Sequence, residues 1–202
     1  MLDTVLVGGG LVYVAIALAS IIGLGVVVER LWRLLPLRGL FGQVLAQVEG
    51  AQRQGDLDRL QRDLEQHDDA MSRVVTRALS ARDGGAEHLR VVAQEAAQQE
   101  VPALERGLGA LAVVGQVAPL LGLLGTVAGL MQAFRAASEA ERVTPALLAD
   151  GIYHALGTTA AGLCVAIPAW IAYASLSGLV GRLVDRLEAV ASDLPRVLEV
   201  TD

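Results

Sequence analysis

The side chains most able to do chemistry lie inside, or one residue before, two long stretches that carry no Asp, Glu, Lys or Arg, residues 107–134 and 151–181. Polar groups in such apolar surroundings usually face the interior of a helix bundle or a water-filled path. Hydroxyl, amide and imidazole groups there can exchange hydrogen bonds and protons. The polar residues of this kind are Gln116, Thr126, Gln132, Asp150, His154, Thr158 and Thr159.

The threonines allow two interpretations. A helical threonine can bond a carbonyl oxygen of its own preceding turn and merely pack between helices. For Thr126, Thr158 and Thr159 together, with small residues around them, we favour a shared polar lining. Asp150, His154 and Thr158 are spaced four residues apart, so they share one helical face.

An acidic residue is missing where an ion path would need it. The two stretches contain no carboxylate, and Asp150 stands at the outer end of the second. If the chain helps to conduct protons, a partner must supply a carboxylate near the middle of the membrane. We rank Thr126, Thr159, Thr158 and His154 first as path-lining residues, and Asp150 and Gln116 second.

Other chemistry finds little support. The chain has no cysteine pair, no HExxH motif and no lysine, its three histidines are far apart in sequence, and Cys164 is its single cysteine. We therefore expect no enzyme, no metal site and no cofactor. A net charge of −6 also gives no clustered basic face for nucleic acid.

Small residues recur with helical spacing in the same stretches. Gly125 and Gly129 form a small-xxx-small face, which lets two membrane helices approach closely. A dinucleotide-binding loop would need a strand before the glycines. We expect packing roles for Gly122, Gly125, Gly129, Gly162 and Pro168.

The elements that hold these residues are predicted by the uncharged stretches. Residues 4–28, 107–134 and 151–181 form runs of 25, 28 and 31 residues without Asp, Glu, Lys or Arg. About 20 apolar residues suffice for a helix to cross the hydrocarbon core. The first run is too long for a signal peptide and lacks a positive flank, so we interpret it as a retained anchor. The sequence predicts an all-α integral membrane protein with three transmembrane helices.

Arginine placement predicts the orientation, because cytoplasmic flanks are enriched in arginine. The predicted segments are a periplasmic N-terminus with the first span (1–29), a cytoplasmic helical domain (30–106), the second span (107–134), a periplasmic loop (135–145), the third span (146–181) and a cytoplasmic C-terminal helix (182–202). The arginines at the cytoplasmic span ends are Arg30, Arg33, Arg38, Arg106, Arg182 and Arg186.

The cytoplasmic domain is predicted to be helical. A turn is expected at Gly55, with Asp56 capping the next helix. Another helix covers residues 71–81. From Ala86 the pattern predicts one long rod into the second span, with Pro102 as the only interruption. Thr144 and Pro145 form a start signal for the third long helix.

At this point two motifs resemble those of a known family. Residues 118–127, APLLGLLGTV, continuing to Phe134, resemble the second-span signature of ExbB and TolQ, and LERGL at 104–108 resembles its lead-in. Residues 151–163, GIYHALGTTAAGL, followed by VAIPA at 165–169, resemble the third-span signature. Glu29 and Arg30 after the first span also fit. The dense match covers roughly residues 100–175.

The resemblance implies a subunit of the MotA/TolQ/ExbB type in the bacterial inner membrane. Such a subunit is expected to form a pore as a homo-oligomer, a pentamer around two copies of an ExbD/TolR-type single-span partner, whose membrane aspartate carries the proton. The work would reach a TonB/TolA-type protein. By position, Thr126 and Thr159 match the family's pore-lining threonines. Family members often have Glu where this chain has His154. A histidine can also titrate near neutral pH, so a relay and simple packing are both open.

Two further functions stay open. A gliding or motility stator is one, although MotA-type chains generally have four spans and a larger cytoplasmic domain. A non-conducting scaffold for a partner helix is the other. The first span has no polar residue deep inside it beyond Tyr13 and Ser20, so we expect it to be a lipid-facing anchor.

Overall fold

The computed structural model describes residues 10–140 and 144–198, and all regular structure in these residues is helical. This confirms the all-α prediction for the described part of the chain. The N-terminal tail, residues 141–143 of the predicted periplasmic loop and the last four residues lie outside it. The elements are α2 (Gly10–Gln54), α3 (Leu57–Leu64), α4 (Ala70–Ser80), a 3-10 turn η1 (Arg82–Gly84), α5 (Ala86–Glu105), α6 (Leu108–Glu139) and α7 (Pro145–Val197).

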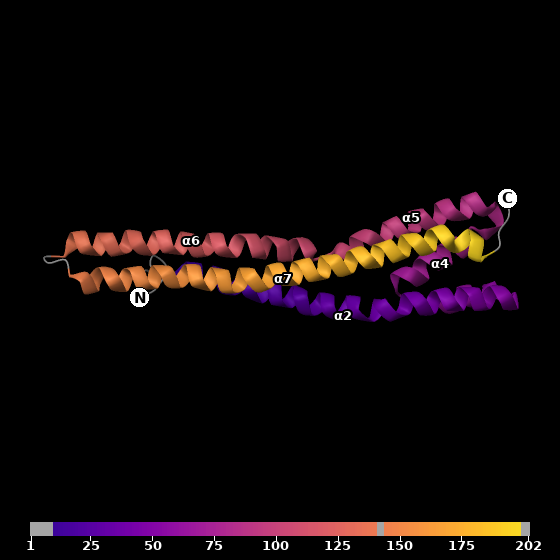
Figure 1. The fold of residues 1–202 in the computed structure, drawn as a ribbon, viewed down its shortest axis with the longest axis horizontal. Helices are drawn as coiled ribbons and strands as arrows, with labels where there is room; N and C mark the ends of the chain where they lie inside the picture. The colour runs from indigo at the N-terminus through magenta and orange to yellow at the C-terminus, as the bar shows by residue number, and fades with distance from the viewer. Residues whose placement is uncertain (1–9, 141–143, 199–202) are drawn as a thin grey trace. The chain divides into compact units, whose positions relative to one another are not determined.

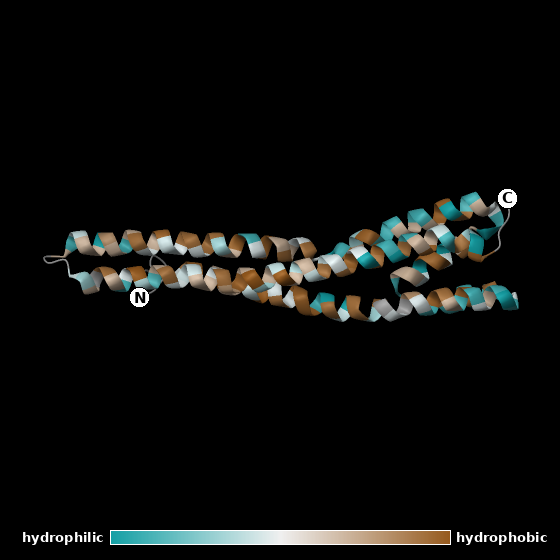
Figure 2. Ribbon diagram, in the orientation of Figure 1, coloured by the Kyte–Doolittle hydropathy of each residue, from teal (hydrophilic) through white to brown (hydrophobic). Residues whose placement is uncertain are grey.

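Three helical regions are long and apolar enough to cross a membrane, which agrees with the predicted number of spans. They lie within residues 10–54, 86–139 and 148–197. Figure 2 shows apolar residues dominating α6 and the first half of α7, whereas α5 carries many polar residues. The chain is a multi-pass membrane protein.

The chain divides into two compact units, and α2 and α7 each contribute to both. One unit contains residues 1–29 and 107–175, and the other contains residues 30–106 and 176–202. In the first, α6 and the first half of α7 lie side by side (Figure 1), and α2 turns Val12 and Ile16 inward, at 9% and 4% exposure. Much of the outer surface of this unit is apolar, which suits contact with lipid or with other membrane helices.

The second unit is a helical bundle with an aliphatic core. Its buried side chains include Leu34, Val48, Met71, Val74, Leu79, Leu89, Leu183, Leu187 and Leu194. Asp69 caps α4 by accepting hydrogen bonds from the Ser72 amide (3.0 Å) and hydroxyl (2.6 Å). Arg73 donates to both carboxylate oxygens of Glu100, at 2.8 and 2.6 Å, and this bond raises the pKa of the guanidinium.

Two sequence predictions in this region were wrong. The expected rod from Ala86 into the second span is broken, since α5 ends at Glu105 and α6 begins at Leu108. The break falls at Gly107, whose φ of 82° cannot continue a right-handed helix, and α5 runs through Pro102. The turn at Gly55 is confirmed, with φ of 72°. Asp56 precedes α3, but its side chain makes no capping hydrogen bond.

Candidate functional site

Helices α6 and α7 meet along a seam of small residues. A Cβ atom placed on Gly122 would lie 2.8 Å from the Thr158 carbonyl oxygen, and one on Gly125 would lie 2.6 Å from the Thr158 side chain. A Cβ on Gly129 would lie 2.9 Å from that of Ala155, and one on Gly162 would lie 2.5 Å from the Ala118 carbonyl oxygen. Ordinary contacts begin near 3.4 Å, so each of these four positions has room only for glycine.

The close approach brings three hydroxyl groups together inside the membrane unit. The Thr126 Oγ1 atom lies 3.0 Å from the Ala155 carbonyl oxygen and 3.2 Å from that of Gly122, and it contacts Thr159 Oγ1. The Thr158 Oγ1 atom lies 2.7 Å from the Ala155 oxygen and 3.0 Å from the Gly122 oxygen. The Thr159 Oγ1 atom lies 3.2 Å from the Gly122 oxygen. We call Thr126, Thr158 and Thr159 the hydroxyl cluster.

The hydrogen bonds of the hydroxyl cluster can be satisfied within one chain. Each hydroxyl has one proton to donate, and each carbonyl oxygen keeps one lone pair after its helical bond. The carbonyls of Gly122 and Ala155 therefore accept two of the three protons. The contact between Thr126 and Thr159 accommodates the third, because either oxygen can accept. Thr158 is only 2% exposed, whereas the other two hydroxyl groups are half-buried and retain free lone pairs.

His154 and Asp150 lie together near the start of α7. The His154 Nε2 atom is 3.7 Å from Asp150 Oδ1, and their side chains are 70% and 78% exposed. They line a cavity of about 260 Å³ with Gln132 and Ala136 of α6, Thr158 of α7 and Tyr13 of α2. Tyr153 packs edge-on against the His154 ring.

The Thr126–Thr159 pair and the His154–Asp150 pair lie on different sides of the α6–α7 seam. Successive helical residues differ by about 100°, so Thr159 points about 100° from Thr158 in one direction, and His154 and Asp150 point about 40° and 80° in the other. Thr158 lies at the seam between them. The cavity lining includes Thr158 and His154, and Thr126 and Thr159 lie outside it. The structure therefore gathers the three threonines but does not bring His154 to the Thr126–Thr159 pair.

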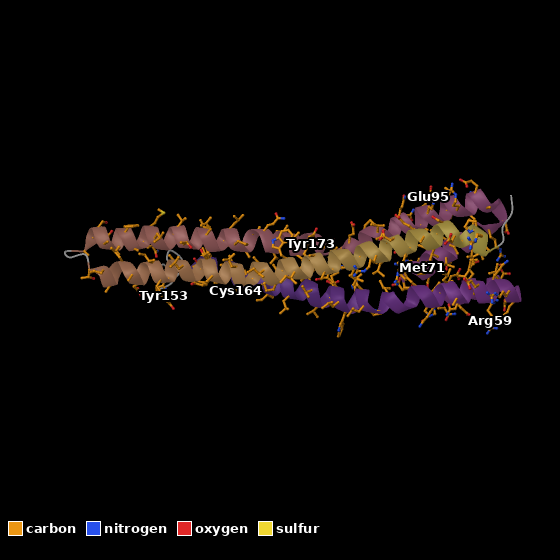
Figure 3. The ribbon with its side chains drawn as sticks, in the orientation of Figure 1. Arg59, Met71, Glu95, Tyr153, Cys164 and Tyr173 are labelled. Carbon is orange, nitrogen blue, oxygen red and sulfur yellow. The ribbon has the colours of Figure 1, made fainter. Side chains whose placement is uncertain are left out.

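The remaining sequence-predicted residues lie elsewhere. Gln116 is exposed on α6, about 120° around the helix from Gly122, among outward-facing apolar side chains. Pro168 is also exposed and lines a second cavity, of about 240 Å³, with Cys164, Gly23 and Val114. Figure 3 labels Cys164 and Tyr153 on α7.

Two residues acquire roles that sequence reasoning had not assigned. Tyr13 of α2 reaches α7 at Gly157. A Cβ atom placed on Gly157 would lie 2.7 Å from the hydroxyl oxygen of Tyr13. The first span therefore has a face that packs against the other two. Arg30 is 2% exposed, and its Nη1 atom donates to the Ala103 carbonyl oxygen at 3.3 Å, in the last turn of α5. A cation there complements the negative end of the helix dipole.

The comparison with protein families decides the affiliation of the chain. Residues 65–189, more than half of the chain, match the family model described as MotA/TolQ/ExbB proton channel family. The chain belongs to the MotA/TolQ/ExbB proton channel family. The matched region of this family member includes the whole hydroxyl cluster and every cavity residue except Tyr13.

Individual relatives agree with this assignment. An ExbB-like biopolymer transport protein of Synechocystis is 35% identical over 194 residues, covering 92% of this chain and 74% of the relative. An ExbB homolog of Methanothermobacter thermautotrophicus is 30% identical over 183 residues, covering 90% and 65%. The Tol-Pal system protein TolQ of Pseudomonas aeruginosa is 40% identical over 116 residues, covering 57% and 48%. The chain thus spans about two thirds of the length of the Methanothermobacter relative and about half of the length of the Pseudomonas TolQ.

Proposed function

We propose that this chain is an ExbB/TolQ-like proton-channel subunit that converts proton-motive force into mechanical work. The observation that carries the proposal is the Thr126–Thr159 hydroxyl pair, half-buried in a membrane unit whose second and third apolar stretches contain no carboxylate. A path of this kind is incomplete without an acid. An ExbD/TolR-type single-span partner, with an aspartate at membrane depth, would complete it.

The hydroxyl pair is suited to meet such an acid. The Thr126 hydroxyl has three neighbouring oxygen atoms to which it can donate, so redirecting its proton leaves the other groups bonded. A hydrogen bond between neutral groups contributes about 0.5–1.5 kcal/mol, and one to a charged group contributes about 1.5–3 kcal/mol. A partner carboxylate beside Thr126 and Thr159 is therefore stabilised while charged and released when it takes up a proton. Each proton moved down the membrane potential supplies about 2.3 kcal/mol per 100 mV.

The proposal includes an assembly and an orientation. Exposed apolar side chains cover much of α6 and the first half of α7, Leu120, Leu123, Leu124, Leu156, Leu163 and Ile167 among them. We expect them to pack in a homo-oligomer, a pentamer around two partner helices, in a bacterial inner membrane. The N-terminus and the 135–145 loop would be periplasmic. Residues 30–106 and the C-terminal part of α7 would be cytoplasmic, and work would pass to a TonB/TolA-type protein.

A non-conducting scaffold is the second candidate, and one observation favours it. All three hydroxyl protons have acceptors within the chain. Holding α6 against α7 would therefore be a sufficient role for the hydroxyl cluster. A scaffold needs those bonds for stability and not for proton transfer. The two functions therefore differ in what a conservative substitution does to proton flux at unchanged assembly.

Co-purification followed by reconstitution tests the proposal. The chain is purified with any single-span membrane protein that accompanies it, and the mass of the complex gives the stoichiometry. Proteoliposomes of that complex are then assayed for proton uptake with a pH-sensitive dye under an imposed potential. A five-to-two complex that conducts supports the proposal. A complex that assembles but shows no flux above empty liposomes supports the scaffold.

A further inference from the structure

We propose that the cavity bounded by Tyr13, Gln132, Asp150, His154 and Thr158 is a water-filled vestibule that collects protons inside each subunit. This inference rests on the proposed function, since it assigns a proton-capturing role to a site separate from the Thr126–Thr159 pair. Hydronium in the cavity gives a proton to the Asp150 carboxylate or the His154 imidazole. That group later returns the proton to another water molecule, so no further reactant is required.

The lining of the cavity favours water. Polar side chains reach it from three helices, namely Tyr13 from α2, Gln132 from α6, and Asp150, His154 and Thr158 from α7. A pocket holds ordered water when it is roomy and offers each molecule two to four polar partners. About 260 Å³ lined by Tyr13, Gln132, Asp150 and His154, none of them buried, meets both conditions.

Tyr13 brings α2 to one side of the cavity. Its hydroxyl oxygen lies 2.7 Å from the place that a Cβ atom on Gly157 would occupy, one residue before Thr158 and three after His154. The phenol therefore lines the cavity and offers its water a hydroxyl group.

The inner end of the cavity is sealed. Gly125 against Thr158 and Gly129 against Ala155 leave no space between α6 and α7 for an added methyl group. Within the part of the chain that the structure describes, the Thr158 hydroxyl bonds carbonyl oxygens alone, at 2.7 and 3.0 Å. A carbonyl oxygen accepts a hydrogen bond but has no proton to pass on. The described chain of exchangeable protons therefore stops at Thr158. A collected proton leaves through water at the open side of the cavity, where Asp150 and His154 are exposed, and not through the seam.

Thiol labelling tests whether the cavity holds water. In a Cys164→Ser background, Gln132→Cys places a thiol in the cavity, and Ser138→Cys places one on the exposed last turn of α6. The assembled protein in lipid nanodiscs is treated with a positively charged methanethiosulfonate reagent. Only the thiolate reacts, and it does not form in apolar surroundings. We expect Gln132→Cys to react at a rate comparable with Ser138→Cys. A cavity thiol that stays unreacted while Ser138→Cys is fully modified overturns the inference.

This outcome is independent of the proposed function. Labelling reports water and not proton flux. A hydrated cavity in a protein that conducts no protons would contradict the proposed function alone, whereas a dry cavity in a conducting protein would contradict only the vestibule.

Proton flux at two pH values tests the collecting role. The titratable groups lining the cavity are Asp150, His154 and Tyr13, and α6 contributes only the neutral Gln132 amide. Because capture becomes limiting when protons are scarce, Asp150→Asn and His154→Gln should each lower flux several-fold at pH 8 on the outer side and much less at pH 6. Equal losses at both values, or no loss, contradict the collecting role.

Discussion

The backbone contact between Gly122 and Thr158 in the α6–α7 seam offers a quantitative prediction. In Gly122→Ala the new methyl carbon would lie 2.8 Å from the Thr158 carbonyl oxygen, whereas ordinary contact begins near 3.4 Å. Both groups belong to helix backbones and cannot rotate away. The helices must therefore separate by about 0.6 Å at this level, the difference between those two distances.

That separation stretches the hydrogen bonds across the seam. The bonds from Thr126 to Ala155, from Thr158 to Gly122 and from Thr159 to Gly122 measure 3.0, 3.0 and 3.2 Å. Adding 0.6 Å takes each of them to the limit of hydrogen bonding or beyond it. Such bonds between membrane helices contribute about 0.6 kcal/mol each on average. Because the Gly122 carbonyl accepts only one of the two protons offered to it, two such bonds are lost, roughly 1 kcal/mol, to which overpacking adds about 1–3 kcal/mol.

The control for this prediction is Gly109→Ala. It lies on the same helix, and its Cβ atom would meet nothing within 4 Å. Both substitutions gain about 1 kcal/mol of helix propensity. Unfolding by SDS titration in mixed micelles should show Gly122→Ala less stable than the native chain by about 1–3 kcal/mol. Gly109→Ala should be as stable as the native chain or slightly more so. Equal stability of the two variants would refute the reasoning about the seam.

Three further predictions concern the second unit, each checked by thermal or denaturant unfolding. Asp69→Ala removes the cap on the Ser72 amide and should cost about 0.5–2 kcal/mol; a change below a few tenths would contradict the cap. Arg30→Met removes the charge-assisted hydrogen bond to the Ala103 carbonyl at the end of α5, for a loss of about 1.5–3 kcal/mol; an unaltered midpoint would argue against it. The buried Thr76 hydroxyl has no hydrogen-bond partner among the described residues, so Thr76→Val should be neutral or stabilising by up to about 1 kcal/mol, and a clear loss would show a missed bond.

The sequence was most informative where a pattern is long. Three uncharged runs predict three membrane-spanning helices, because each run is long enough for a helix that satisfies its own backbone groups in lipid. The start of α7 at Pro145 follows from the Thr144–Pro145 pair in the same way. The break before α6 could not be predicted from the sequence. Pro102 was the more visible helix breaker, yet a helix can bend around proline, and the positive φ at Gly107 is a property of the folded backbone.

The candidate site was predictable in composition but not in arrangement. Spacing within one helix shows that Asp150, His154 and Thr158 share a face. It does not show that α6 covers Thr158, which leaves His154 on one side of the seam and Thr159 on the other. Tyr13 gave no signal, because a single polar residue in an apolar run is equally suited to the lipid interface. Its position beside Gly157 depends on how α2 packs against α7, which the sequence does not show.

Proton flux through the Thr126–Thr159 pair tests the central claim most directly. The complex with its single-span partner is reconstituted with Thr126→Val, Thr159→Val, Thr159→Ser or, as a matched control, Thr76→Val. A lost bond of about 1.5–3 kcal/mol to a charged group predicts a fall in flux of roughly tenfold to a hundredfold for both valine variants in the pair. Thr159→Ser keeps a hydroxyl and should retain most of the flux, as should Thr76→Val. Assembled Thr126→Val and Thr159→Val complexes that conduct as well as the Thr76→Val control would contradict the account.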